Sequence, residues 1–221
     1  MSCERDIIGD TGLKFFGMMS ASISHELKNA LAIINENAGL LQDFTLMADK
    51  GVPMDPQRLK TLAEKVMNQI RRADRIVKNM NRFSHSVDDS VKSIDLHSII
   101  ELVATLSGRF ALMRGVTIEL SHPANPVMIT TNPFFLLNLI WLCLDFAMDA
   151  ADDGKSVSLI GEETERGARI RFLGLKGLEG KPTHAFPAES EKALIEVLEA
   201  ELEVDVEVGE LVLGLPRKIG R

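Results

Sequence analysis

Two long stretches of this chain repeat apolar residues at steps of three and four, with a break between them. In residues 9–48 the apolar or small positions are Leu13, Phe16, Ser20, Ile23, Leu27, Ala30, Ile34, Leu41 and Phe44. In residues 56–83 they are Leu59, Leu62, Val66, Gln69 or Ile70, Ala73, Ile76, Met80 and Phe83. Such steps place side chains on one narrow face of an α-helix. The pattern predicts two long helices that pack lengthwise.

The break between the stretches predicts a hairpin. Gly51 and Pro53 supply a stop for the first helix, and Asp55-Pro56 offers an N-cap followed by proline at the first helical position. The apolar seam of a two-helix hairpin stays open on one side, and pairing two hairpins into a four-helix bundle covers it. We therefore expect a homodimer.

The periodicity changes after a polar linker, residues 84–93. The patterns that follow predict a helix at 95–106, strands at 116–120 and 127–130, a buried helix at 133–151, strands at 156–160 and 168–173, a helix at 188–201, and strands at 203–208 and 211–215. Helices interspersed with mostly antiparallel strands favour one sheet covered on one face. The expected fold class is α+β, with a helical-hairpin domain at 9–88 and an α/β domain at 94–221.

Composition and charge exclude several classes of protein. The chain is 45% hydrophobic and 26% charged, as folded proteins are, and its net charge of −7 argues against a general nucleic-acid binder. The start of the chain lacks the pattern of a signal peptide, and the apolar run 133–151 contains Asn138, Asp145 and Asp149, which argues against a membrane span. Two cysteines without ligand spacing fit a reducing cytoplasm. We expect a cytoplasmic protein that binds neither nucleic acid nor membrane.

The charges are unevenly distributed along the chain. Residues 189–210 hold nine acidic side chains and one lysine, whereas residues 55–85 hold eight basic and three acidic ones. The simplest interpretation of both runs is a solvated face. A basic helix face is also suited to meeting an acidic partner.

His25 lies in the first helical stretch, within the sequence SISHELKNAL of residues 22–31. At 100° per residue it projects from the flank of the apolar stripe, and Asn29 follows one turn later along the same edge. His25 is therefore expected to face solvent. The spacing of His25, Glu26 and Asn29 lacks the second histidine of a zinc-protease motif, so no metal site is expected there.

The sequence SHELKN on the first helix of such a hairpin, followed by an α/β region, resembles the core of two-component sensor histidine kinases. That resemblance implies a dimerisation and histidine-phosphotransfer hairpin, then a catalytic ATP-binding domain. The ending Asn29-Ala30 is most similar to the nitrogen-regulatory type, in which proline usually stands at the position of Ala30. The family's helix kink is then not expected here.

The second domain departs from the family at its ATP-binding motifs. On the long helix at 133–150, the position of the family's magnesium-binding asparagine is Phe146 and that of the earlier asparagine is Leu142. The motif D-x-G-x-G is replaced by Leu173-Gly174-Leu175-Lys176-Gly177, and residues 181–187 contain no glycine. A benzyl group cannot ligate a hard cation. We expect no ATP binding, no cofactor and no metal site in this chain.

The chemistry that remains is phosphoryl transfer by His25. A neutral imidazole is both a good phosphoryl acceptor and, once phosphorylated, a good donor. Glu26 could bond or deprotonate the ring, and Asn29 could orient a water molecule or a phosphoryl oxygen. The expected function is a histidine phosphotransferase that exchanges phosphoryl groups with the aspartate of response-regulator receiver domains, which would bring their own Mg²⁺.

Lys28, Arg71, Arg72, Arg75 and Lys78 are the candidate receiver-docking residues. The alternatives are a receiver phosphatase that uses Glu26 and Asn29, and a non-catalytic regulator that binds a sensor kinase or a receiver. A residual ATP-dependent kinase is the least favoured hypothesis.

Overall fold

The computed structural model describes residues 2–121, 125–152, 155–180 and 186–220. The chain forms two compact units. One unit is Met18–Ser84, and the other joins the residues up to Gly17 to those from His85 onward. The expected domain ranges, 9–88 and 94–221, thus differ from these units chiefly in residues 9–17, which group with the second unit.

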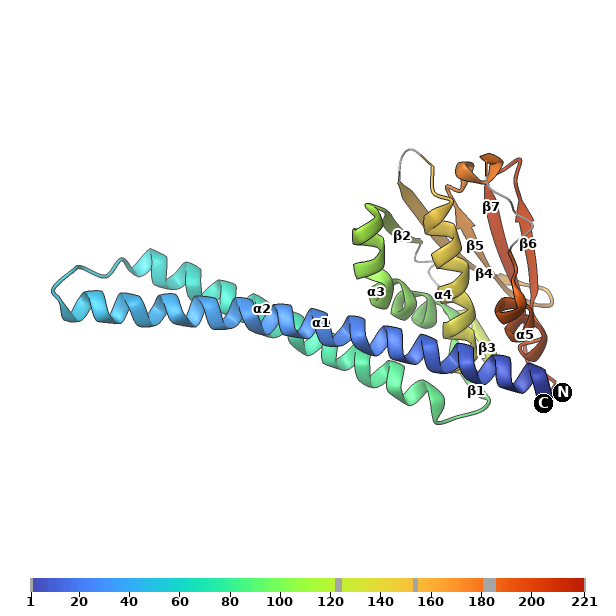
Figure 1. Cartoon of the computed structure of the whole chain (residues 1–221), viewed down its shortest axis with the longest axis horizontal. Coiled ribbons are helices and arrows are strands. Elements are labelled where there is room, and N and C mark those ends of the chain that lie inside the picture. Colours follow the sequence, from blue (N-terminus) through green and yellow to red (C-terminus); the bar gives the residue numbers. More distant parts are fainter. Residues whose placement is uncertain (1, 122–124, 153–154, 181–185, 221) are drawn as a thin grey trace. The chain divides into compact units, whose positions relative to one another are not determined.

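Helices α1 (Ser2–Asp49) and α2 (Pro56–Ser84) form the predicted hairpin (Figure 1). The connection bends at Gly51, whose φ of 85° lies in the left-handed region that favours glycine. The Asp55 carboxylate accepts a hydrogen bond from the Gln57 amide at 2.9 Å and so caps α2. Near this end of the hairpin, the Arg58 guanidinium lies 5.0 Å from the centroid of the Phe44 ring.

Fewer side chains are buried inside the hairpin unit than the apolar pattern predicted. Its buried residues are Met19, Ser22, Ile23, Ala30, Asn37, Leu62 and Phe83. Ile70 and Met80, predicted in the seam, are instead 46% and 43% exposed. Two helices enclose only the side chains on their facing lines, so residues one step around the helix stay uncovered.

The second unit is a five-stranded sheet with helices, and a separate two-stranded ribbon. Its elements in chain order are β1 (Lys92–Asp95), α3 (Leu96–Arg114), β2 (Thr117–Ser121), β3 (Met128–Thr131), α4 (Pro133–Asp149), β4 (Ser156–Thr164), β5 (Gly167–Leu173), α5 (Glu189–Val197), β6 (Glu201–Asp205) and β7 (Glu210–Pro216). Short 3₁₀ turns lie at His85–Val87 and Lys176–Gly180. The order in the large sheet is β2-β4-β5-β7-β6, with β2 and β4 parallel and the other pairs antiparallel. The chain therefore has the expected α+β fold class.

Local caps explain where the helices of this unit begin and end. The Asp95 carboxylate accepts from the amides of His97 and Val127 and starts α3. Gly115, with φ 66°, ends α3. The Asn132 side chain caps α4 ahead of Pro133.

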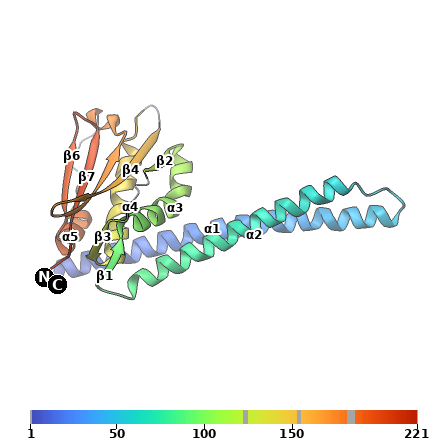
Figure 2. The ribbon, with the colours of Figure 1, turned by 180° about the vertical axis from the view of Figure 1, so that it is seen from behind.

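The central part of this unit is α4, whose side chains are mostly buried. α3 packs against it, and the rings of Phe110 and Trp141 lie 4.8 Å apart between centroids. By length and composition α3 could cross a membrane, but half of its apolar window is buried, as expected of a core helix. Figure 2 shows these elements from behind.

Several element boundaries differ from the sequence predictions. β1, which pairs with β3, includes residues 92 and 93 of the predicted linker. α3 continues to Arg114, and α5 ends at Val197 because Glu199 adopts a φ of 52° and turns the chain into β6. β6 thus begins at Glu201, where register with β7 holds it.

The first helical residues pack within this same unit. The Phe15 and Phe134 rings lie 5.7 Å apart between centroids, and a Cβ on Gly12 would lie 3.1 Å from Phe134. Leu13, predicted in the hairpin seam, is 73% exposed. Phe15 is the buried member of this turn instead.

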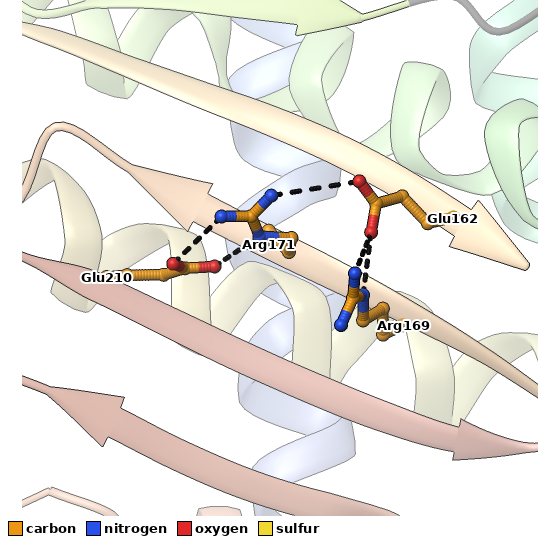
Figure 3. A network of polar contacts seen from close by, with 4 residues as sticks. All are labelled: Glu162, Arg169, Arg171 and Glu210. Atoms are coloured by element: carbon orange, nitrogen blue, oxygen red, sulfur yellow. Dashed lines mark hydrogen bonds and ion pairs between the residues drawn. The ribbon is translucent and has the colours of Figure 1, made fainter. Parts of the chain in front are cut away.

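The open face of the sheet carries an ion-pair network (Figure 3). Arg171 on β5 binds the Glu210 carboxylate with both Nε and Nη2, the latter at 3.0 Å, and also approaches Glu162 at 3.7 Å. Arg169 binds Glu162 at 2.6 Å. The hydrogen bond to Glu210 raises the pKa of Arg171, so this cation stays charged. The network links β4, β5 and β7 across the face.

Candidate phosphoryl-transfer site

His25 is exposed on α1, on the flank of the helix as predicted. Ile23 and Ala30 on the same helix are buried, so the two sides of this turn differ in environment. The side-chain nitrogen of Asn29 lies 3.2 Å from Nδ1 of His25. The spacing of four residues brings the two side chains together, because residues i and i+4 are neighbours on a helix surface.

Glu26 has a different partner from the one expected. Its Oε2 lies 3.9 Å from Nη2 of Arg72 on α2, and among the described residues no bond joins Glu26 to His25. The following residue on a helix points about 100° away, so Glu26 turns toward α2 while His25 stays on the flank. The expectation that Glu26 bonds the His25 ring directly therefore has no counterpart in this geometry.

The candidate docking residues fall into two groups. Arg71, Arg72 and Arg75 line one shallow groove of about 580 Å³ along α2, together with Asn68, Gln69 and Asp74. Arg71 donates to the Asn68 side chain at 3.0 Å. Lys78 pairs with Asp74 at 2.8 Å, and Lys28 is exposed on α1. The arginines thus share a basic surface.

Sequence reasoning missed the link between Glu26 and Arg72. The antiparallel register of the hairpin could have suggested it, since Phe44 and Arg58 meet near the turn and Glu26 and Arg72 lie farther along the same two helices. A contact between two helices depends on side-chain direction as well as register, and the apolar pattern does not carry that information.

In the second unit, an aromatic side chain stands at the position of the family's magnesium-binding asparagine. Phe146 on α4 is half-buried and stacks on Phe186, with ring centroids 4.0 Å apart and an angle of 6° between the rings. Leu142 is also half-buried. Residues 181–185 of the glycine-free loop lie outside the described part of the chain. Two phenyl rings offer no oxygen ligand to a cation.

Gly177, the glycine shared with the family's D-x-G-x-G motif, has a packing role. A Cβ there would lie 2.9 Å from the carbonyl oxygen of Ala150, and the Gly177 amide donates to that oxygen at 3.1 Å. Close backbone contact at the end of α4 accounts for this glycine without any ligand.

The remaining histidines lie apart from this site in the sequence. His85 pairs with Asp88 at 2.7 Å, and His97 packs over Gly161. His122 and His184 fall outside the described residues. Among the described residues, no group of three or more histidine, cysteine or acidic side chains is arranged to hold a metal ion.

The hairpin is similar in sequence to a known domain family. Residues 17–87 match the family model of the His Kinase A (phospho-acceptor) domain. This segment includes His25, Glu26 and Asn29 and both helices of the hairpin unit. No curated protein matches the chain. The hairpin is therefore similar in sequence to phospho-acceptor domains.

Several solved structures of histidine kinases are similar to the chain. The histidine kinase AdeS of Acinetobacter baumannii is 14% identical, with 87% of this chain and 98% of that one covered and a TM-score of 0.48. The ATP-binding domain of PrrB from Mycobacterium tuberculosis is 20% identical over 58% of this chain and 98% of that one, with a TM-score of 0.44. The cytoplasmic segment of the histidine kinase QseC is 19% identical over 66% and 93%, with a TM-score of 0.42.

Proposed function

We propose that this protein is a histidine phosphotransferase of two-component signalling, which exchanges phosphoryl groups between His25 and the aspartate of response-regulator receiver domains. The observation that carries the proposal is the exposed His25 beside Asn29, within a segment that matches a phospho-acceptor domain. The proposed setting is the cytoplasm, where the partners are receivers and a sensor kinase.

The transfer needs little from the protein beyond position and charge. When the donor is a receiver, the bond from phosphorus to the aspartate oxygen breaks and a bond from phosphorus to Nε2 of His25 forms, leaving a free carboxylate. For that step Nε2 needs its lone pair, so Nδ1 must carry the ring proton. A half-turn of the Asn29 amide presents its oxygen to Nδ1–H and favours this tautomer.

The basic groove on α2 supports the proposed partner. Receiver active sites are acidic, and Arg71, Arg72 and Arg75 give the hairpin a cationic surface. Complementary charge speeds the encounter of two proteins and favours one orientation.

ATP has no part in this proposal. Phe146 replaces the magnesium-binding asparagine of the family motif and is engaged with Phe186. Isothermal titration of the full chain with ATP and Mg²⁺ is expected to show no binding heat. Saturable binding together with autophosphorylation would favour the kinase hypothesis instead.

The direct test uses phosphorylated receivers from the same genome. At least one is expected to label the wild-type protein with an acid-labile phosphoryl group, whereas His25→Gln remains unlabelled. Glutamine keeps a polar side chain of similar length at this exposed position, so folding is preserved. Absence of label on the wild type with every receiver would exclude phosphotransfer and favour the non-catalytic regulator.

The contact between Asn29 and His25 also supports a second candidate, a receiver phosphatase. An amide at this position could orient a water molecule toward the receiver's phosphoryl group. In that case His25→Gln would retain phosphate release, and the label on His25 would be a side reaction.

A further inference from the structure

Arg72 is held to α1 only loosely. Its Nη2 lies 3.9 Å from Oε2 of Glu26, and no hydrogen bond is formed between the two groups. In contrast, Arg171 binds Glu210 with two nitrogens, one of them at 3.0 Å. The Arg72 and Glu26 side chains are 42% and 27% exposed, and an exposed ion pair of this length contributes little to stability. The N–H donors of Arg72 can therefore turn to another acceptor.

A phosphoryl group on His25 would be an acceptor of higher charge on the same turn of α1 as Glu26. Glu26 directly follows His25, so its contact places Arg72 beside the turn of α1 that carries the histidine. The neighbouring Arg71 is already engaged by Asn68 and by the backbone oxygen of Met67. Arg72 is the member of the basic groove with a partner on α1.

We propose that Arg72 binds the phosphoryl group carried by His25, and that Glu26 is the counter-ion that holds Arg72 until this group arrives. The inference rests on the proposed function and changes the role of Arg72 from receiver docking to phosphoryl binding. A phosphoryl group brings up to two negative charges and three acceptor oxygens, compared with one charge on Glu26. The planar guanidinium can bind two of those oxygens at once.

The experiment phosphorylates the full chain with phosphoramidate, a small donor that needs no receiver and no nucleotide. The bond from phosphorus to the donor nitrogen breaks, ammonia leaves, and the bond from phosphorus to Nε2 of His25 forms. Phosphorus NMR follows the rate of phosphohistidine formation and the chemical shift of the product.

Arg72→Gln is expected to slow labelling about tenfold, since it removes one charge-assisted interaction with the transferring group. The labelling rate of Arg72→Lys is expected to lie between those of the wild type and Arg72→Gln, because lysine keeps the positive charge but lacks the planar guanidinium. Arg72→Gln should also shift the phosphorus resonance, which a merely structural role would not do. Glu26→Gln, which removes the competing counter-ion, should label faster than the wild type.

Lys65→Gln is the matched control, since Lys65 is an exposed cation seven residues before Arg72 and thus on nearly the same face of α2. It should label at the wild-type rate. Equal thermal unfolding of all variants would show that the hairpin is intact.

The outcomes separate this inference from the proposed function. If the wild type is labelled, His25→Gln is not, and Arg72→Gln reacts at the wild-type rate with an unshifted resonance, then only the role of Arg72 is overturned. A lower rate in Glu26→Gln would contradict the counter-ion role of Glu26. If the wild type takes up no more label than His25→Gln, both the proposed function and the inference fail.

Discussion

At the scale of single residues, the site is governed by helix geometry. His25 and Asn29 meet because they are four positions apart, whereas Glu26 is directed to Arg72 although it adjoins His25 in sequence. The site thus contains two separate contacts, one between His25 and Asn29 and one between Glu26 and Arg72. Asn29 contacts the ring directly, whereas Glu26 contacts Arg72.

Asn29→Ala tests which of the two proposed activities depends on the amide. We expect the label on His25 to persist but to form more slowly, because the imidazole remains exposed while it loses the amide that favours its reactive tautomer. Phosphate release from a bound receiver should fall at least about tenfold. Receiver dephosphorylation and the label on His25 are measured in the same samples. Asn35→Ala, an exposed asparagine on the same helix, is the control. Unchanged phosphate release in Asn29→Ala would exclude the amide from hydrolysis.

At the scale of elements, the contact between α3 and α4 contains the most informative titrating group. Arg114 on α3 binds Asp145 at 2.8 Å and Asp149 at 2.9 Å, both on α4. Burial nevertheless raises the pKa of Asp145, an effect that the nearby Arg114 only partly offsets. The native state therefore binds a proton at Asp145 more tightly than the unfolded chain does.

This pKa shift sets the sign of a pH effect on stability. The pKa of Asp145 is higher in the native state than its ordinary value of 3.8. The contribution of Asp145 to the free energy of unfolding therefore falls as the pH rises from 3.8 through the native pKa. Asp145→Asn lacks this titration, so the wild type should lose stability relative to the variant as pH increases over that range. Denaturant unfolding followed by the fluorescence of Trp141, the single tryptophan, reports on this unit. A constant difference between the two proteins at all pH values would contradict the assignment.

At the scale of the whole molecule, the hairpin unit leaves large apolar side chains uncovered. On α2 these are Met67, Ile70, Val77 and Met80, and Leu31 on α1 is 53% exposed. Apolar residues at helical spacing on an exposed face are typical of a surface that another helix covers. This arrangement supports the expected homodimer through paired hairpins.

Ile70→Glu tests the homodimer. Ile70 is 46% exposed in the single chain, and a carboxylate at a buried dimer contact would lose its hydration. The dissociation constant should rise at least about a hundredfold, as for a central interface residue, which sedimentation velocity can detect. Lys60→Glu, on an exposed polar position of the same helix, should leave the dimer intact. A wild type that sediments as a monomer at high concentration would rule the homodimer out.

Local features allowed much of this fold to be predicted from the sequence. The apolar period gives the two helices, Gly51 and Pro56 give their ends, and Asn132 with Pro133 starts α4. Each of these depends on residues close together in the chain. The flank position of His25 belongs to the same class, because it follows from the angle between successive residues on a helix.

Long-range contacts decided the rest. β1 became a strand because β3 was available to pair with it, and β6 began early because β7 set its register. Phe15 rather than Leu13 was buried because Phe134 lies against it. At the site, the sequence by itself placed His25 and Asn29 on one exposed edge. Only the tertiary structure gave Glu26 its partner, because the direction of a side chain between two helices depends on both of them.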